Sequence, residues 1–181
     1  MNILAVEPYY SGSHKAFLSG LQKESSHTIH TVTLDHGQEK WRMHGYSIDL
    51  SKATKNVEAK IDLLLVSSMT NLATYVALTN PRFANVPKVM YMHENQITQP
   101  LPDKEPRDWT LSYFNYLSML TADVLIFNTK FHYEECIEAM PQFLEHFGKD
   151  KHLDTVDEVA AKSRILYPGL DLKPFDAHRG R

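Results

Sequence analysis

The 181-residue sequence has few of the features that mark disulfide-stabilised, membrane-spanning or nucleic-acid-binding chains. Its single cysteine, Cys136, excludes a disulfide within the chain and favours a reducing compartment. No run reaches the roughly 18 apolar residues of a membrane span, and no signal peptide opens the sequence. We therefore expect a cytoplasmic protein without membrane contact. The formal charge is −3 and the Lys and Arg residues are scattered, so this chain offers no basic patch for nucleic acid.

Several catalytic and cofactor motifs are also missing. The first strand-to-helix loop contains one glycine, Gly12, whereas the dinucleotide fingerprint needs three and the P-loop needs a following G-K-[ST]. The pair His93-Glu94 suggests the zinc motif H-E-x-x-H, but Ile97 stands where the second histidine would be. The sequence Ser67-Ser68-Met69 lacks the G-x-S-x-G elbow of serine hydrolases. We expect no NAD, no metal and no other cofactor.

Apolar runs and amphipathic stretches alternate along the chain. The runs predict strands at residues 2–6, 27–34, 62–67, 86–92, 123–127 and 164–167, and the amphipathic stretches predict helices at 14–24, 47–60, 70–78, 108–120, 130–147 and 155–162. Residues 35–46 are expected to form a loop with a short element, and residues 97–108 to form a loop or lid because they contain three prolines. This alternation predicts an α/β fold, a Rossmann-like parallel sheet flanked by helices, over residues 1–170.

Two polar segments follow predicted strands, and each carries a histidine and a carboxylate. The first runs from Glu7 to His14 and the second from His93 to Gln96. Ligands bind outside the carboxyl ends of the strands in open α/β sheets, so both segments are candidates for one site. Gly12 allows a tight turn or a close ligand, and the helix start after Ser13 can bind an anion or sugar hydroxyls. His93 and Glu94 suit acid–base work or sugar binding.

Structural roles compete with these assignments. Ser11 or Ser13 can cap a helix, and Ser67 and Ser68 favour a cap on the helix that follows them. His93 and Glu94 can satisfy each other or nearby backbone groups. Asn128 and Thr129 can cap a helix or line the cleft, and Cys136 is expected to be a buried structural thiol. Trp41, Arg42 and His44 can clamp an acceptor, or fill the core and surface instead.

Three segments carry a resemblance to a known family. They are Glu7–Lys15, Tyr91–Gln96 and Ala122–Asn128, and the first two are the more specific in combination. With them the chain resembles the N-terminal half of the glycosyltransferase-like domain-containing proteins, a family that includes the tRNA-queuosine α-mannosyltransferases. The resemblance implies a GT-B fold, with the acceptor on this half and the donor on a C-terminal domain. Residues 171–181 would begin the linker to that domain.

The resemblance also implies an activity and a set of site residues. The activity is a retaining, metal-independent transfer of mannose from a nucleotide sugar, GDP-mannose, to an acceptor such as queuosine in tRNA. His93 and Glu94 would orient the reacting sugar or the acceptor. The substrate-binding residues would be Gly12, Ser13, His14, Asn95, Gln96 and Asn128, with Gly12 and Ser13 near the donor phosphates. We expect little turnover from the 181 residues alone. The alternatives are a non-catalytic RNA- or glycan-binding module and a small hydrolase that uses His93 and Glu94.

Overall fold

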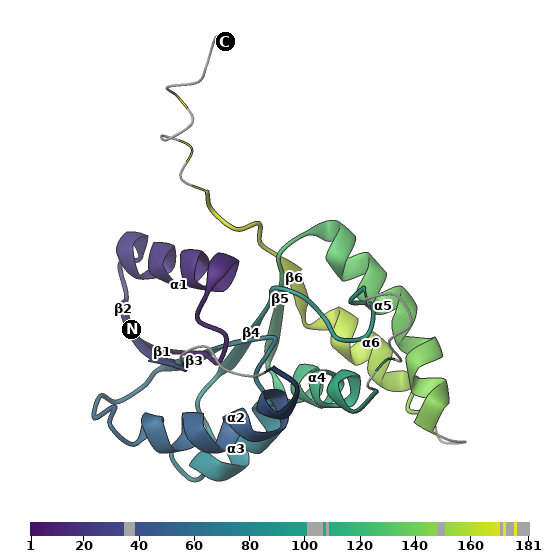
Figure 1. Cartoon of the computed structure of the whole chain (residues 1–181), viewed down its shortest axis with the longest axis horizontal. Coiled ribbons are helices and arrows are strands. Elements are labelled where there is room, and N and C mark those ends of the chain that lie inside the picture. Colours follow the sequence, from purple (N-terminus) through teal and green to yellow (C-terminus); the bar gives the residue numbers. More distant parts are fainter. Residues whose placement is uncertain are drawn as a thin grey trace.

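A six-stranded parallel sheet forms the centre of the protein, as seen in a computed structural model (Figure 1). The structure describes residues 1–34, 39–100, 107, 109–147, 151–170, 172 and 176, without the side chains of 39–43. The strands are β1 (Asn2–Glu7), β2 (Thr28–Thr33), β3 (Leu63–Ser67), β4 (Lys88–Met92), β5 (Val124–Phe127) and β6 (Ser163–Ile165). Their order in the sheet is β2-β1-β3-β4-β5-β6. The α/β fold and the predicted strands are confirmed, with ends shifted by one or two residues.

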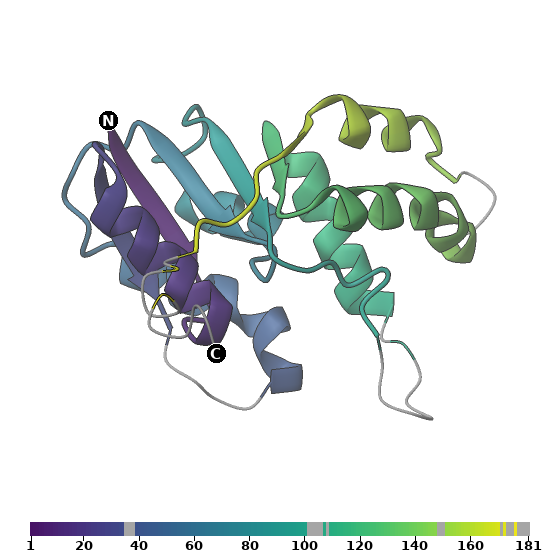
Figure 2. The same ribbon diagram turned by 90° about the horizontal axis from the view of Figure 1, so that it is seen from above.

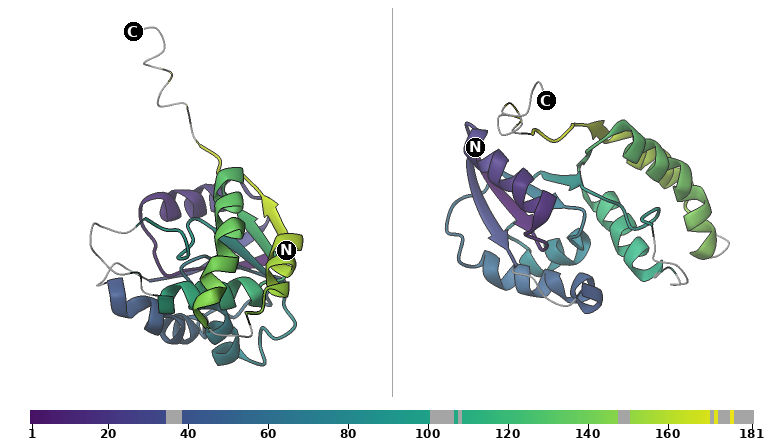
Figure 3. Two further views of the ribbon diagram at one scale, coloured as in Figure 1. Left: turned by 90° about the vertical axis from the view of Figure 1, so that its right-hand side faces the viewer. Right: turned by 45° about the horizontal axis from the view of Figure 1, so that its top comes forward.

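The helices cover the two faces of the sheet unequally. They are α1 (Gly12–Glu24), α2 (Glu39–Thr54), α3 (Leu72–Thr79), α4 (Trp109–Thr121), α5 (Lys130–Leu144) and α6 (Asp154–Ala161), and a 3-10 turn, η1 (Glu145–Phe147), follows α5. Figures 1 and 2 show α2, α3 and α4 together on one face and α1 on the other, over β1 and β3. Helices α5 and α6 lie at the end of the sheet formed by β5 and β6 (Figure 3).

The core lies between the sheet and the layer of α2, α3 and α4. Leu64 of β3, Met90 of β4 and Leu125 of β5 are fully buried there, together with Tyr75 of α3 and Met119 of α4. Strands buried in this way have near-continuous apolar sequences, as β3 has, because a parallel sheet is covered on both faces. The same runs that predicted the strands therefore supply the core.

Helix α2 differs from its prediction at both ends. It begins at Glu39, inside the segment expected to be a loop, and it ends at Thr54 instead of residue 60. Tyr46 and Leu50 lie one helical turn apart and both enter the core, and such packing supplies most helix stability. At the other end, the guanidinium of Arg82 donates to the carbonyl oxygens of Thr54, Val57 and Ala59. These carbonyls are thereby satisfied without a continuing helix.

Three expectations concern segments that the structure describes only in part. Residues 101–106 and 108 of the predicted lid lie outside the described residues, and so does the predicted start of the helix at residue 108. Most of the predicted linker, residues 171–181, is also outside them. Among the helices of the described residues, none has the length and apolar character needed to span a membrane.

Candidate functional site at the carboxyl edge of the sheet

Polar side chains from three strand ends meet at the carboxyl edge of the sheet. Glu7 ends β1, Ser67 ends β3, and His93 and Glu94 directly follow β4. The chain runs outward from β1 to β2 and then crosses back to β3, so the direction of winding reverses between β1 and β3. Crevices at such a reversal are the usual ligand sites of open α/β sheets. The predicted location of the site is therefore the one that the topology favours.

The turn between β1 and α1 adopts the conformation for which glycine is suited. Gly12 has a φ of +49°, and a Cβ atom built there would meet nothing within 4 Å. The glycine is therefore needed for its backbone angle and leaves open space beside it. Ser11 occupies the N-cap position, but its side chain makes no capping hydrogen bond. The prediction of a serine side-chain cap is wrong for Ser11, so its hydroxyl does not occupy the N–H groups of this helix start.

His14 joins the two polar segments. Its Nδ1 lies 3.0 Å from Oε2 of Glu7, and its Nε2 lies 3.2 Å from Oε2 of Glu94. Burial alone would lower the pKa of His14, but the hydrogen bonds and charges of Glu7 and Glu94 outweigh it and raise the pKa to about 9. His14 is therefore an imidazolium at neutral pH. It is only 8% exposed, so its ring is largely shielded from water.

His93 has the opposite protonation state. Its ring stacks on that of His14 with centroids 4.0 Å apart, and the rings of Phe17 and Tyr91 contact it edge-on. This burial, together with the charges of His14 and His132, lowers the pKa of His93 to about 3. Among the described residues, the ring nitrogens of His93 have no hydrogen-bond partner. A neutral imidazole can donate at one nitrogen and accept at the other, so it can bind a hydroxyl group.

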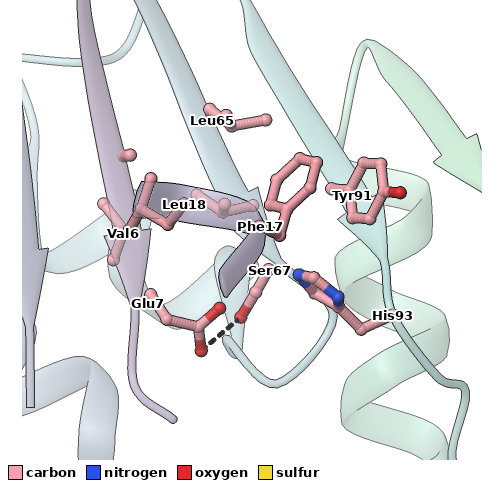
Figure 4. A pocket seen from close by; sticks show the side chains of 10 residues that line it. Val6, Glu7, Phe17, Leu18, Leu65, Ser67, Tyr91 and His93 are labelled. Carbon is pink, nitrogen blue, oxygen red and sulfur yellow. Dashed lines mark hydrogen bonds between the residues drawn. The ribbon is translucent and has the colours of Figure 1, made fainter. Parts of the chain in front are cut away.

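A small pocket lies beneath α1 and joins this polar cluster to an apolar wall. Figure 4 shows Glu7, Ser67 and His93 grouped at one end, and Phe17 and Tyr91 at the other. Phe17 of α1 stacks on Tyr91 of β4 with ring centroids 4.0 Å apart. The volume of the pocket is about 20 Å³, which is room for little more than one water molecule, so this pocket is too small to hold a substrate by itself.

Glu94 presents a carboxylate toward solvent. Its side chain is 30% exposed, and one oxygen accepts from His14. The other oxygen makes no hydrogen bond within the described part of the chain. The backbone N–H of Glu94 lies 3.5 Å from Oγ of Ser68. His93 and Glu94 thus make no hydrogen bond to each other, and the proposal that they satisfy one another is wrong.

Asn128 supports the site from β5. Its Nδ2 donates to the backbone carbonyl of His93 (2.8 Å), and its Oδ1 lies 2.9 Å from Nδ1 of His132. Thr129 caps α5 by accepting from the N–H of His132, which confirms the capping prediction for this pair of residues. Asn128 therefore fixes the backbone that carries His93. Its role as a substrate contact stays a prediction.

Asn95 and Gln96 turn the chain after the site. Asn95 is 3% exposed, and its Oδ1 accepts from the N–H groups of Ile97 and Thr98. Gln96 receives hydrogen bonds on its backbone carbonyl from Ser112 and Arg107. These contacts give both residues a structural role at this turn. Direct substrate binding by either residue stays a prediction, and the burial of Asn95 speaks against it.

Two site residues are absent from the predicted catalytic and binding residues. The sequence marks Glu7 only as the carboxylate of its segment, and it predicts Ser67 as a cap of the following helix. In the structure Oγ of Ser67 donates to Oε1 of Glu7 (3.1 Å), and the cap of α3 is Asn71, which accepts from the N–H of Thr74. A polar residue at the last position of a buried strand is the signal that could have found both.

The remaining candidates take other places. Cys136 is fully buried, as predicted, and burial raises its pKa to about 12. The ring of His44 packs edge-on against Phe114, with centroids 5.2 Å apart. The side chains of Trp41 and Arg42 lie outside the described residues.

Glu7, His14 and His93 together form the kind of group that can hold a metal ion, since one donor atom from each lies within 4.8 Å of the others. Both nitrogens of His14 already face carboxylates, and an imidazolium has no lone pair to give a metal. The geometry is therefore that of a hydrogen-bonded ion-pair chain. Metal-free function stays a prediction.

The fold and the site define a Rossmann-like α/β domain with a buried charged cluster at the carboxyl edge of its sheet. The family model described as tRNA-queuosine alpha-mannosyltransferase N-terminal matches residues 2–170, and the chain belongs to this family. It is 27% identical over 175 residues to a tRNA-queuosine alpha-mannosyltransferase of Drosophila melanogaster. That match covers 96% of this chain and 46% of the relative, so the chain spans about half of the relative's length.

Proposed function

We propose that the protein to which this chain contributes transfers mannose from GDP-mannose to queuosine in tRNA. Membership of the mannosyltransferase family and the name of the fly relative support this activity. The chain matches less than half of that relative, so we assign the binding of the nucleotide sugar mainly to a C-terminal domain. The acceptor side is assigned to this chain. The scattered basic residues suggest that many phosphate contacts to the tRNA come from elsewhere in the protein.

The observation that carries the proposal is the pair of unoccupied hydrogen-bonding groups at the sheet edge. Within the described residues, the ring nitrogens of His93 and one oxygen of Glu94 have no protein partner. Both groups can accept a hydrogen bond from a hydroxyl. We assign Glu94 to orient the acceptor hydroxyl and His93 to a hydroxyl of the acceptor or of the sugar. Such fixed groups act mainly by holding the reactants in place.

The start of α1 is assigned to the donor. Helix starts favour anions, and the open space at Gly12 lets the donor phosphates approach the N–H groups of Gly12 and Ser13. In the transfer, the acceptor oxygen bonds to the anomeric carbon and the bond from that carbon to the phosphate oxygen breaks. The acceptor hydroxyl gives its proton to the departing phosphate oxygen, and GDP leaves with the electron pair of the broken bond. The proposed reaction retains configuration and uses neither a metal nor a further cofactor.

The test is a transfer assay with the full-length protein. The substrates are radiolabelled GDP-mannose and tRNA that carries queuosine, and the matched control is the same tRNA with guanosine at that position. We expect label only on the queuosine tRNA, and much less transfer by His93→Ala and Glu94→Gln. Parallel reactions with GDP-glucose and UDP-galactose test the choice of donor. No transfer from GDP-mannose would refute the proposal, whatever the other two donors give.

The two alternative functions predict different results, which companion assays of hydrolysis and of binding distinguish. A small hydrolase would release free sugar or phosphate from model glycosides or phosphate esters, and Glu94→Gln would abolish that release. A binding module would hold tRNA or glycan without turnover, and His93→Ala would leave its affinity unchanged. Neither alternative is favoured by the family to which the chain belongs.

A further inference from the structure

The side chain of Glu7 is buried, and its carboxylate is held by hydrogen bonds on both of its oxygens. It is 3% exposed, and its carboxylate accepts three hydrogen bonds from three parts of the fold. The N–H of Tyr9 lies 2.7 Å and Oγ of Ser67 3.1 Å from Oε1, while Nδ1 of His14 lies 3.0 Å from Oε2. Glu7 is therefore fixed, whereas the side chain of Glu94 is 30% exposed and is the carboxylate open to a ligand.

His14 transmits this fixed position to Glu94. A neutral imidazole donates at one nitrogen only, so a ring that faces carboxylates at both nitrogens must be doubly protonated to donate to both. The ring of His93 stacks on that of His14 with centroids 4.0 Å apart. Two imidazolium rings at this distance would repel each other, so the stacking fits a charged His14 beside a neutral His93. The result is a continuous chain of hydrogen bonds from Glu7 through His14 to Glu94.

We propose that Glu7 is a positioning residue, which keeps His14 doubly protonated and thereby holds the Glu94 carboxylate in place for the acceptor hydroxyl. This inference rests on the proposed function, since it assigns Glu94 to the acceptor. It adds a residue that touches no substrate and acts through another side chain.

The loss of the Glu7 charge has a defined consequence. His14 is faced by Glu7 from β1, by Glu94 and His93 from the segment after β4, and by the ring of Tyr9. Without Glu7 one carboxylate remains to offset the burial of the ring, so the pKa of His14 falls from about 9. When His14 loses a proton, its Nε2 can present a lone pair to Glu94, and the hydrogen bond that holds Glu94 is lost.

The direct measurement is an NMR titration of the full-length protein with isotopically labelled histidine. The variant Glu7→Gln keeps the size of the side chain and an oxygen for the N–H of Tyr9, but it has no charge. In the wild type we expect His14 not to titrate between about pH 6 and 8. In Glu7→Gln we expect it to titrate within or below that range. A wild-type His14 that titrates near its ordinary pKa would overturn the proposal, even if the variant fails to fold.

Kinetics separate positioning from a merely structural role. We expect Glu7→Gln to lower kcat for sugar transfer by roughly 10- to 100-fold and to leave KM for the nucleotide sugar within about twofold, because the start of α1 is unchanged. Glu7→Asp keeps the charge and should recover part of both kcat and the His14 titration. The control is Glu134→Gln on α5, which removes an exposed carboxylate paired with Lys130. It should change neither quantity.

The outcomes that overturn the positioning role of Glu7 differ from the one that refutes the proposed function. A Glu7→Gln protein with unchanged kcat, or with an unchanged His14 titration, would overturn the positioning role. A raised KM for the nucleotide sugar with kcat intact would do the same, because it would place Glu7 in donor binding. The titration needs no turnover, so a wild type without transfer activity would refute the proposed function separately.

Discussion

The protonation states of His14 and His93 predict that stability is greatest near pH 6.5. The pKa of His14 is raised to about 9, so the folded state holds a proton that the unfolded state releases between pH 6.5 and 9. Stability from His14 is therefore complete below pH 6.5 and is lost as pH rises through 9. The difference between 6.5 and about 9, at 1.36 kcal/mol per pKa unit, is about 3 kcal/mol.

His93 acts in the opposite direction at acidic pH. Its pKa is lowered to about 3, so the unfolded state takes up a proton below pH 6.5 that the folded state refuses. Stability therefore falls as pH drops from 6.5 toward 3. Stability is therefore lost above pH 6.5 through His14 and below pH 6.5 through His93. Its maximum lies between these two losses, near the ordinary pKa of histidine.

Urea unfolding of the wild type and three variants tests the alkaline loss. The free energy of unfolding is measured at pH 6.5, 7.5, 8.5 and 9.5 for the wild type, His14→Gln, His93→Gln and the exposed control His27→Gln. We expect the wild type and His27→Gln to lose about 3 kcal/mol more than His14→Gln over this range. His14→Gln starts from a lower stability because Glu7 loses a partner. Equal losses in the wild type and His14→Gln would refute the assigned charge of His14.

Three further predictions concern a helix cap, the cysteine and metal dependence. Asn71→Ala should lower the free energy of unfolding by about 1 kcal/mol, measured by urea titration, because Asn71 caps α3. Ser11→Ala should lower it by less than about 0.5 kcal/mol, because the Ser11 side chain makes no capping hydrogen bond. Equal losses in the two variants would contradict this assignment of the caps. Cys136 is fully buried with its pKa raised to about 12, so a thiol reagent should label it in urea and not in native buffer, and rapid native labelling would refute its burial. Sugar transfer should survive EDTA, because both nitrogens of His14 already face carboxylates. Loss of activity that one divalent cation restores would refute metal-free transfer, with Glu7, His14 and His93 as the group to test first for the cation.

The sequence predicted most of the fold because the information for it is local. The run Leu63–Val66 is apolar at every position, which is the pattern of a strand covered on both faces. The helical ends were less predictable, since they depend on distant groups. Helix α2 ends at Thr54, where Arg82 donates to the carbonyl of Thr54 and to that of Ala59 beyond the helix, and nothing within residues 39–60 indicates that contact.

The site was predicted in location and only partly in composition. Parallel strands end at the same edge of a sheet, so polar residues after β1 and β4 had to lie near each other. Tertiary contacts decided which residue caps α3. Ser67 donates to Glu7 instead of capping the helix, and Asn71 is the residue that caps it. A hydroxyl binds whichever partner the fold brings within reach, and its sequence neighbours do not identify that partner.

The sequence by itself determined the parallel α/β architecture, the buried thiol and the glycine turn that opens the first helix, because each depends on local pattern and composition. Only the tertiary structure placed His14 between Glu7 and Glu94, which is 80 residues away. Only that placement, with the aromatic rings around His93, makes one imidazole charged and its neighbour neutral. The physical reason is that a protonation state depends on burial and on nearby charges, and both arise when distant segments pack together.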